Sequence, residues 1–322
     1  MLLAVEDLHI AFVTFDGTVH ALNGVNFQIQ RGEIFGLAGE TGSGKTVTAL
    51  TILKLLPSNT GMLKGRVIFS GRDLLTEDED GLKEVRGKKI SMIFQDPAAS
   101  LNPVFSVSEQ LGDVLRSHGT IDKIRQEKSQ ELLRAVGFSD TGKILQGYPH
   151  ELSGGMKQRV ATAIAIASEP ELIIADEPTT SLDVVTQLQI LNLLKTIRSR
   201  RGSSILLITH NLGILARHSD RVGIMYAGSI AEIAPTSLIF RNPLHPYTKA
   251  LLSAVPRERG KSLYTIAGEV PNLLEAPQGC SFHTRCERAS EICRSVKPQL
   301  IEPERGRLVA CHLYATRSED HV

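Results

Sequence analysis

Residues 39–46 read GETGSGKT, and they constrain this chain more than any other stretch. They match the pattern G-x-x-x-x-G-K-[ST] at every fixed position, after an apolar strand-like run (residues 33–38) and before a helical pattern (residues 44–56). Gly42 and Gly44 let the backbone wrap tightly and point its N–H groups inward, and the helix N-terminus adds about half a positive charge. The stretch therefore predicts a phosphate-binding loop between a buried strand and a helix.

Two short sequences supply the groups that phosphate chemistry needs. In the loop, we expect Lys45 to reach the β- and γ-phosphates and Thr46 to offer its hydroxyl to Mg²⁺. Residues 172–177 read LIIADE, so a buried strand ends in two carboxylates. Asp176 is placed to hold magnesium through water, and Glu177, one residue on, is placed to polarise an attacking water. Together, the two sequences predict hydrolysis of a nucleoside triphosphate.

Composition limits the other classes of function. The 322 residues carry 36 basic and 35 acidic side chains, so the net charge of +1 gives no case for nucleic acid or an anionic membrane. The longest uncharged run, residues 202–216, is too short and too polar to span a bilayer. The first ten residues, MLLAVEDLHI, lack the pattern of a signal peptide, so we expect a cytoplasmic location.

Alternating apolar runs and helical patterns predict an α/β fold. Continuous apolar runs without alternation indicate strands covered on both faces, hence a largely parallel sheet. These runs are residues 33–38, 89–94, 172–175 and 205–208. Residues 2–12 and 25–29 alternate better and predict an antiparallel flank, which makes the sheet core mixed. Residues 96–170 are mostly helical, with an amphipathic stretch at 122–136, and predict a helical subdomain.

The composition changes near residue 235. Eight of the chain's 14 prolines follow, at positions 235, 243, 246, 256, 271, 277, 298 and 303. Such spacing breaks long helices and central strands. We therefore predict two domains, residues 1–235 and a separate, small, loop-rich C-terminal region, residues 236–322.

Residues 152–159, LSGGMKQR, provide a second helix start suited to an anion. Ser153 is a residue type favoured at helix N-caps. Gly154 and Gly155 have no side chains, so they leave the backbone amides at the start of the following helix accessible. Together with GETGSGKT and LIIADE, this stretch resembles the signature sequence of ATP-binding cassette (ABC) ATPases. The resemblance implies a P-loop ABC cassette over about residues 1–235, in which the signature caps the γ-phosphate bound by a second cassette.

Further positions match the same family. Gln95, in IFQDP, resembles the Q-loop glutamine, and Ser181, Leu182 and Asp183 resemble the D-loop that crosses the dimer. His210, in LLITHN, resembles the switch histidine that contacts the γ-phosphate. The resemblance implies catalysis by Glu177, His210, Lys45 and Gln95. It also implies ATP contacts from Phe15, Gly39, Glu40, Thr41, Gly42, Ser43, Gly44, Lys45, Thr46, Val47, Gln95, Ser153, Gly154, Gly155, Asp176 and Asp183, and magnesium contacts from Thr46, Gln95 and Asp176. For the adenine-stacking aromatic, Phe12 is the alternative to Phe15, because Asp16 stands where the family often has an aromatic.

The segment NPLHPYTKALLSAVP, residues 242–256, narrows the family. It resembles the HPYT segment of dipeptide and oligopeptide importer ATPases, whose subfamily also handles nickel and some sugars, and FQDPAASLNP fits the same subfamily. The resemblance implies two membrane permease subunits, a second ATPase subunit (identical or a paralogue), and indirectly an extracytoplasmic solute-binding protein. It places the chain on the cytoplasmic face of the membrane.

Two other functions are less consistent with the sequence. Non-transport ABC ATPases of DNA repair or translation tend to carry a long coiled-coil insertion or two cassettes, whereas only 105 residues separate Thr46 from Leu152 here. An iron–sulfur electron carrier would leave the full set of nucleotide motifs unexplained.

All four cysteines lie late in the chain: Cys280, Cys286, Cys293 and Cys311, in the pattern C-x5-C-x6-C-x17-C. The spacing matches neither a zinc ribbon nor a bacterial ferredoxin. A metal staple would help a small region with few apolar residues to fold. The subfamily resemblance favours a structural [4Fe–4S] cluster; zinc, free thiols and disulfides remain alternatives, with His283 and His312 as conceivable further ligands.

Overall fold

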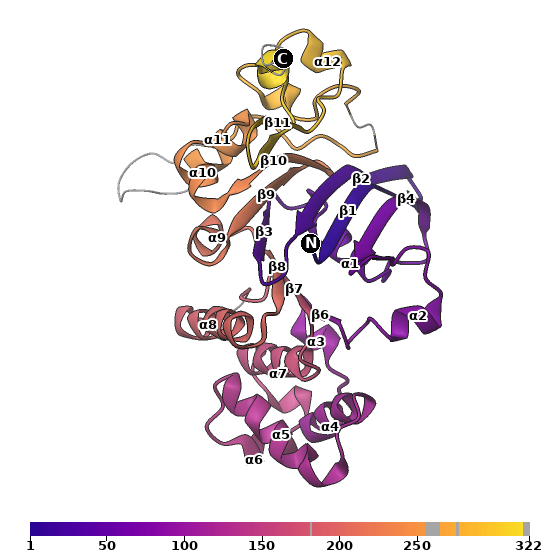
Figure 1. Ribbon diagram of the computed structural model, residues 1–322, viewed down its shortest axis with the longest axis vertical. Coiled ribbons are helices and arrows are strands. Elements are labelled where there is room, and N and C mark those ends of the chain that lie inside the picture. Colours follow the sequence, from indigo (N-terminus) through magenta and orange to yellow (C-terminus); the bar gives the residue numbers. More distant parts are fainter. Residues whose placement is uncertain (181, 255–264, 275–276, 318–322) are drawn as a thin grey trace. The chain divides into compact units, whose positions relative to one another are not determined.

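The computed structural model describes residues 1–180, 182–254, 265–274 and 277–317 (Figure 1). The chain forms two compact units. Unit 1 comprises Met1–Gln30, Ile34–Thr76 and Thr209–Val322, and unit 2 comprises Arg31–Glu33 and Glu77–Ile208. Among the described residues, no helix combines the length and apolar character that crossing a membrane requires.

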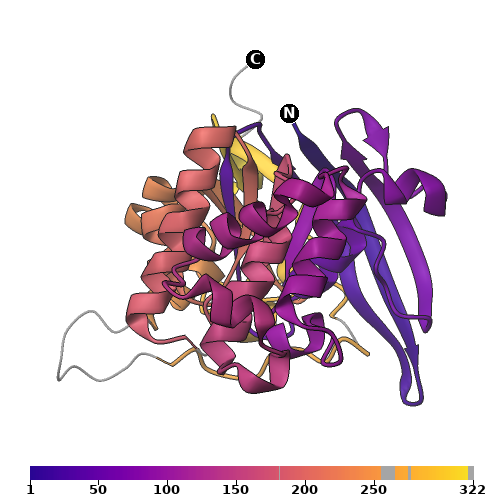
Figure 2. The ribbon, with the colours of Figure 1, turned by 90° about the horizontal axis from the view of Figure 1, so that it is seen from below.

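Unit 1 contains an antiparallel sheet in the order β2-β1-β4-β5. Its strands are β1 (Leu3–Thr14), β2 (Gly17–Ile29), β4 (Thr60–Phe69) and β5 (Arg72–Asp73). The long indigo and violet strands curve together in Figure 2. The predicted antiparallel flank is confirmed, although its second strand begins at Gly17 rather than at residue 25, because residues 17–23 also pair with β1.

A second set of strands in unit 1 runs in the order β11-β12-β10-β9-β3. These are β3 (Ile34–Ala38), β9 (Arg221–Tyr226), β10 (Ser229–Pro235), β11 (Ile301–Glu304) and β12 (Arg307–Val309). β3 and β9 are parallel, and the remaining pairs are antiparallel. All five residues of β3 are buried, as its unbroken apolar sequence predicts. The helices of the unit are α1 (Lys45–Ile52), α9 (Leu212–His218), α10 (Thr236–Arg241), α11 (Pro246–Ser253) and α12 (Ile292–Ser295).

Unit 2 is built on three parallel strands in the order β8-β7-β6. They are β6 (Ile90–Ile93), β7 (Leu172–Asp176) and β8 (Ser204–Ile208), and every residue of β7 and β8 is buried. The predicted helical subdomain holds α3 (Pro97–Ser100), α4 (Val107–Ser117), α5 (Asp122–Ala135), α6 (Thr141–Gln146) and α7 (Gly154–Ile166). Figure 1 shows α4 to α7 gathered below the strands, and α4 and α5 each contact α7. The unit also contains α2 (Glu79–Lys83) and α8 (Val184–Arg201).

The C-terminal region continues the strand order of unit 1. β12 pairs with β10, with Leu308 opposite Ile233 and Val309 opposite Glu232. Residues on both sides of position 235 belong to unit 1. They include β10 and β12, which lie far apart in the sequence and pair with each other. The domain division at residue 235 stays a prediction.

Candidate active site and cysteine cluster

The phosphate loop of unit 1 lies between β3 and α1, as its sequence predicts. Gly44 caps α1 in a left-handed conformation (φ 102°), and Gly42 also has a positive φ of 79°. Only glycine adopts such angles at little cost. Gly39 is needed for a different reason: a Cβ at this position would collide with the carbonyl oxygen of Met225 on β9. The glycines therefore serve both the turn and its close packing.

Lys45 turns its ammonium group back over this loop. Its side chain is buried (8% exposed), and Nζ donates to the carbonyl oxygens of Gly39 and Glu40, both at 2.9 Å, and to Oγ of Ser43 at 3.3 Å. The charge is thus held where the loop backbone converges. Thr41 and Thr46 are exposed, and Val47 is half-buried in the first turn of α1.

Glu40 is fixed at three of its groups. Its amide donates to Oη of Tyr247 at 3.0 Å, its carbonyl accepts from Lys45, and its carboxylate accepts from Arg285 at 2.8 and 3.2 Å. Burial raises the pKa of Tyr226, which also accepts a hydrogen bond from Arg285. The hydrogen bond with Glu40 raises the pKa of Arg285 further, so this guanidinium stays charged.

In unit 2, the two predicted carboxylates occupy the end of β7. Asp176 is the last residue of the strand and is 1% exposed, and Glu177 is 7% exposed. Glu177 has a left-handed backbone (φ 49°), which is costly for a residue with a Cβ, by about 1–3 kcal/mol. Its amide donates to Ile208 at 2.9 Å, and Thr180 donates to its carboxylate at 3.3 Å. Strain held by hydrogen bonds at a strand end is typical of a catalytic position.

Most of the other predicted residues of unit 2 lie at exposed positions. Gln95 follows β6 and is exposed. Ser153 caps α7 by accepting from the amide of Met156 at 3.4 Å, and a Cβ on Gly154 would meet nothing within 4 Å. Gly155 is half-buried. Asp183 caps α8, and hydrogen bonds from Thr186 lower the pKa of its carboxyl. Ser181 lies outside the described residues.

In unit 1, His210 and Phe15 lie on the surface. His210 precedes α9, which Asn211 caps with its side chain. Phe15 is fully exposed in the turn between β1 and β2, whereas Phe12 is half-buried. Unit 1 therefore presents the phosphate loop, His210 and Phe15, and unit 2 presents Asp176, Glu177, Gln95, Ser153, Gly154, Gly155 and Asp183. Their roles stay predictions.

The four cysteines line a single cavity of about 250 Å³ in unit 1. Each is half-buried and none forms a disulfide. A backbone hydrogen bond from the Cys280 amide to the Cys293 carbonyl oxygen, at 2.8 Å, joins two of these residues. Burial raises the pKa of Cys280 to about 11 and also raises the pKa values of Cys286 and Cys311. In the described part of the chain, no three His, Cys, Asp or Glu side chains are arranged to hold a metal ion.

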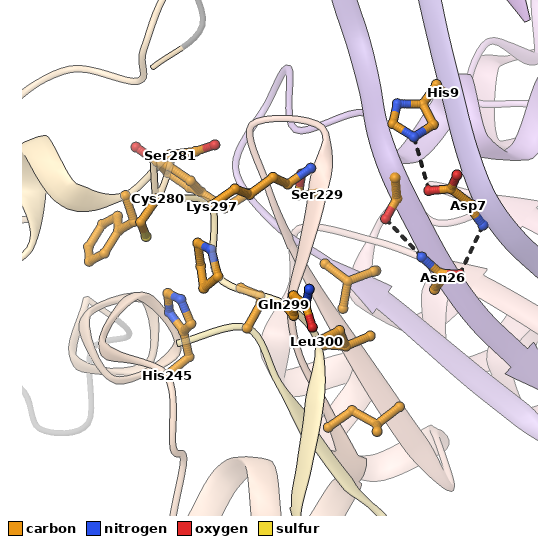
Figure 3. Close-up of a pocket in the computed structure, with 18 residues that line it drawn as sticks. Asp7, His9, Asn26, Ser229, His245, Cys280, Ser281, Lys297, Gln299 and Leu300 are labelled. Atoms are coloured by element: carbon orange, nitrogen blue, oxygen red, sulfur yellow. Dashed lines mark hydrogen bonds and ion pairs between the residues drawn. The ribbon is translucent and has the colours of Figure 1, made fainter. Parts of the chain in front are cut away.

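The two histidines near the cysteines make hydrogen bonds to the backbone. His283 Nδ1 lies 2.8 Å from the Cys280 oxygen, and His312 Nε2 lies 2.8 Å from the Val296 oxygen. Cys280 also borders a larger cavity of about 670 Å³ (Figure 3), with His245 beside it and the hydrogen-bonded pair Asp7 and His9 on the far side.

Two protein families match this chain. The ABC transporter family matches residues 22–180, and the family described as "Oligopeptide/dipeptide transporter, C-terminal region" matches residues 231–293. The dipeptide transport ATP-binding protein DppD of Bacillus subtilis is 44% identical, over 99% of this chain and 97% of that protein. The oligopeptide transport ATP-binding protein OppD of Escherichia coli is 46% identical, over 96% of this chain and 92% of that protein.

The chain belongs to the family of peptide ABC transporter ATP-binding proteins. Members of this family are ATPases, and the chain has their cassette fold, with a mixed sheet and helices. A solved dimeric cassette, bound to ADP and phosphate in a post-hydrolysis state, is 26% identical with a TM-score of 0.66, over 73% of this chain and 99% of that chain.

Sequence reasoning missed the residues that tie this peptide ABC transporter ATP-binding protein's C-terminal region to its phosphate loop. Arg285 and Tyr226 belong to no recognised motif, and Tyr247 belongs only to the HPYT segment. The buried pair of Glu232 and Arg307 was missed as well. Two features of the sequence could have drawn attention to these contacts. Arg285 directly precedes Cys286, and Glu232 is a charged residue within the apolar strand β10. Neither feature identifies the residue that it contacts.

Proposed function

We propose that this ATPase energises the import of peptides or related solutes through separate membrane permease subunits. The observation that carries the proposal is the match along nearly the whole chain to dipeptide and oligopeptide transport ATP-binding proteins, including their C-terminal region. The chain would then work as a peripheral subunit on the cytoplasmic face of the membrane. A solute-binding protein outside the membrane would deliver the cargo.

The proposed mechanism uses two copies of the cassette. The backbone amides of residues 39–47 and Lys45 bind the phosphates of ATP, while Ser153, Gly154 and Gly155 bind the γ-phosphate held by a second subunit, identical or related. The open space beside Gly154 supports this role, because nothing within the described chain requires a glycine there.

Hydrolysis requires a base and stabilisation of the transferring phosphoryl group. Glu177 acts as the general base toward the attacking water, and His210 and Lys45 stabilise the developing charge. Thr46, Asp176 and Gln95 would hold Mg²⁺, which would neutralise phosphate charge when bound. Asp183 completes the contacts that cross the dimer, and Phe15 stacks on the adenine.

Reconstitution tests the transport function. The chain is combined in vesicles with permease subunits and a solute-binding protein from the same organism, and ATP hydrolysis is measured with and without a mixed di- and oligopeptide pool. We expect peptide to stimulate hydrolysis and to accumulate on the side that receives cargo. Hydrolysis that peptides leave unchanged, with no uptake, would contradict the proposal.

We further propose that Cys280, Cys286, Cys293 and Cys311 hold a structural [4Fe–4S] cluster. Four thiols line one cavity and none is used in a disulfide, so the number and kind of donors suit a cluster. In the described residues the thiols are not gathered closely enough to hold a metal, so binding would have to draw them together. A bound cluster would cross-link residues 280–311 and so stabilise a region with little apolar core.

Metal analysis after anaerobic purification distinguishes the alternatives. We expect about four iron and four sulfide per chain, with broad visible absorbance, and loss of both in Cys286→Ser. Zinc at one equivalent without iron would reject the cluster in favour of a zinc site.

A further inference from the structure

Arg285 links the cysteine segment (residues 279–311) to the phosphate loop. It lies in a short 3₁₀ helix (His283–Arg285), directly before Cys286. Its Nη1 donates to Oε2 of Glu40 at 2.8 Å and its Nη2 donates to Oε1 at 3.2 Å. The Arg285 side chain is only 5% exposed, against 23% for Glu40. This bidentate geometry gives the strongest hydrogen bonding between an arginine and a carboxylate.

The guanidinium is itself fixed by groups around it. Nε donates to the carbonyl of Ala267 at 3.1 Å, and Nη1 also donates to Oη of Tyr226 at 3.3 Å. The guanidinium carbon lies 5.8 Å from the centre of the Tyr226 ring. These contacts hold the guanidinium of Arg285 in the orientation in which it meets Glu40.

A cluster of three aromatic side chains supports the same contact. Tyr247 is fully buried, and its hydroxyl accepts from the Glu40 amide. The ring centres of Tyr226 and Tyr247 lie 4.5 Å apart, and Phe282 of the cysteine segment lies 5.2 and 5.3 Å from them. Glu40 is thus held by α11 and by the cysteine segment, and Tyr226 on β9 packs against Tyr247 and accepts a hydrogen bond from Arg285.

We propose that Arg285 is a positioning residue for ATP binding: it neutralises the carboxylate of Glu40 and fixes the entry of the phosphate loop. The inference rests on the proposed role of residues 39–47. A carboxylate beside a triphosphate site repels the ligand unless a cation balances it, and a misplaced Glu40 also displaces the carbonyl to which Lys45 donates. Through Arg285, order in the cysteine segment is transmitted to the nucleotide site.

The experiment is a double-mutant cycle on the full-length protein, with ATP dissociation constants measured by titration without turnover. Arg285→Met keeps the side-chain bulk and removes the charge. We expect it to weaken ATP binding roughly tenfold, about 1.4 kcal/mol. Hydrolysis at saturating ATP should change much less, which is the split expected of a residue that acts through another. Arg305→Met, in an exposed turn of the same region, is the matched control and should bind ATP as the wild type does.

Glu40→Gln completes the cycle. In that background the unbalanced carboxylate is gone, so adding Arg285→Met should change the ATP affinity by less than about twofold. Wild-type affinity in a folded Arg285→Met protein would overturn the proposal, and so would an undiminished loss in the Glu40→Gln background, since that would mean general structural damage.

Two further results keep the test decisive. If Arg285→Met does not fold, Arg285→Lys retains the charge without the bidentate geometry, and an unchanged affinity in that variant would overturn the positioning role and leave only charge neutralisation. If the wild-type chain itself does not bind ATP, the proposed nucleotide site fails, which is distinguishable from a failure of the role of Arg285.

Discussion

The phosphate loop and the C-terminal region of unit 1 are organised in opposite ways. The loop is eight consecutive residues, and Lys45 donates to the carbonyl oxygens of Gly39 and Glu40 and to Oγ of Ser43. The C-terminal region is instead held by residues far apart in the sequence. Glu232 on β10 accepts from the amides of Leu244 and His245 and lies 3.8 Å from Arg307 on β12. The phosphate-binding groups of the first region thus follow one another in the sequence, although Tyr247 and Arg285 hold Glu40 from distant positions. The stability of the second region depends mainly on contacts between distant residues.

This contrast predicts two kinds of variant. Changes to the nucleotide motifs should remove chemistry and leave the fold, whereas changes to the Glu232–Arg307 network should remove stability. The contrast would be wrong if variants of the nucleotide motifs unfolded the protein, or if variants of the Glu232–Arg307 network lost ATP hydrolysis without losing stability.

The largest effect is expected for Glu177→Gln, which keeps the size of the side chain and removes its basicity. Loss of a general base costs about 10²–10⁴-fold in rate, so hydrolysis should nearly stop while ATP still binds. Single-turnover hydrolysis and an ATP titration measure the two properties. Turnover near that of the wild type would remove Glu177 from the mechanism.

The next effect is expected for Arg307→Met, which leaves the carboxylate of Glu232 without its buried cation. Arg307 is 2% exposed and Glu232 is fully buried, so the free energy of unfolding should fall by about 3–5 kcal/mol. Denaturant titration measures it. Arg305→Met is the exposed control, and a loss below about 1 kcal/mol for Arg307→Met would show that the two amides alone satisfy Glu232.

The same contrast explains what the sequence predicted. The loop and the strand ending in Asp176 and Glu177 were predictable because each role follows from its immediate neighbours. The fully buried β3, β7 and β8 were predictable for the same reason. The pairing of β12 with β10 was not, since three residues of Arg307–Val309 carry too little pattern to name a partner strand. Nor could spacing show that Arg285 meets Glu40, 245 positions away.

Lys45→Ala tests the phosphate loop, with a smaller expected effect on ATP binding. Charge-assisted hydrogen bonds contribute about 1.5–3 kcal/mol, so ATP affinity should fall roughly 10- to 100-fold. The melting temperature without nucleotide should stay close to that of the wild type. Lys64→Ala, at an exposed position of β4, is the control for general loss of positive charge. An unchanged ATP affinity would contradict the assignment of the loop.

The smallest effect concerns pH and the C-terminal region. His245 is 3% exposed, its Nδ1 accepts from the Tyr247 amide, and burial lowers its pKa to about 4 although a hydrogen bond with Ala310 opposes that shift. An unfolded histidine titrates near 6.5. Between these values the unfolded chain binds the proton and the folded chain does not. The contribution of His245 to stability is therefore complete above about pH 6.5 and is lost as the pH falls toward 4, by about 1.4 kcal/mol at pH 5.5.

Urea titration at pH 7.5 and 5.5 measures this dependence. His245→Asn keeps an acceptor for the Tyr247 amide but does not titrate, so its stability should fall less than that of the wild type between the two pH values. An identical pH dependence in both proteins would mean that His245 stays accessible to protons in the folded chain. In that case the C-terminal region would be less tightly packed than its buried network implies, and the contrast with the phosphate loop would weaken.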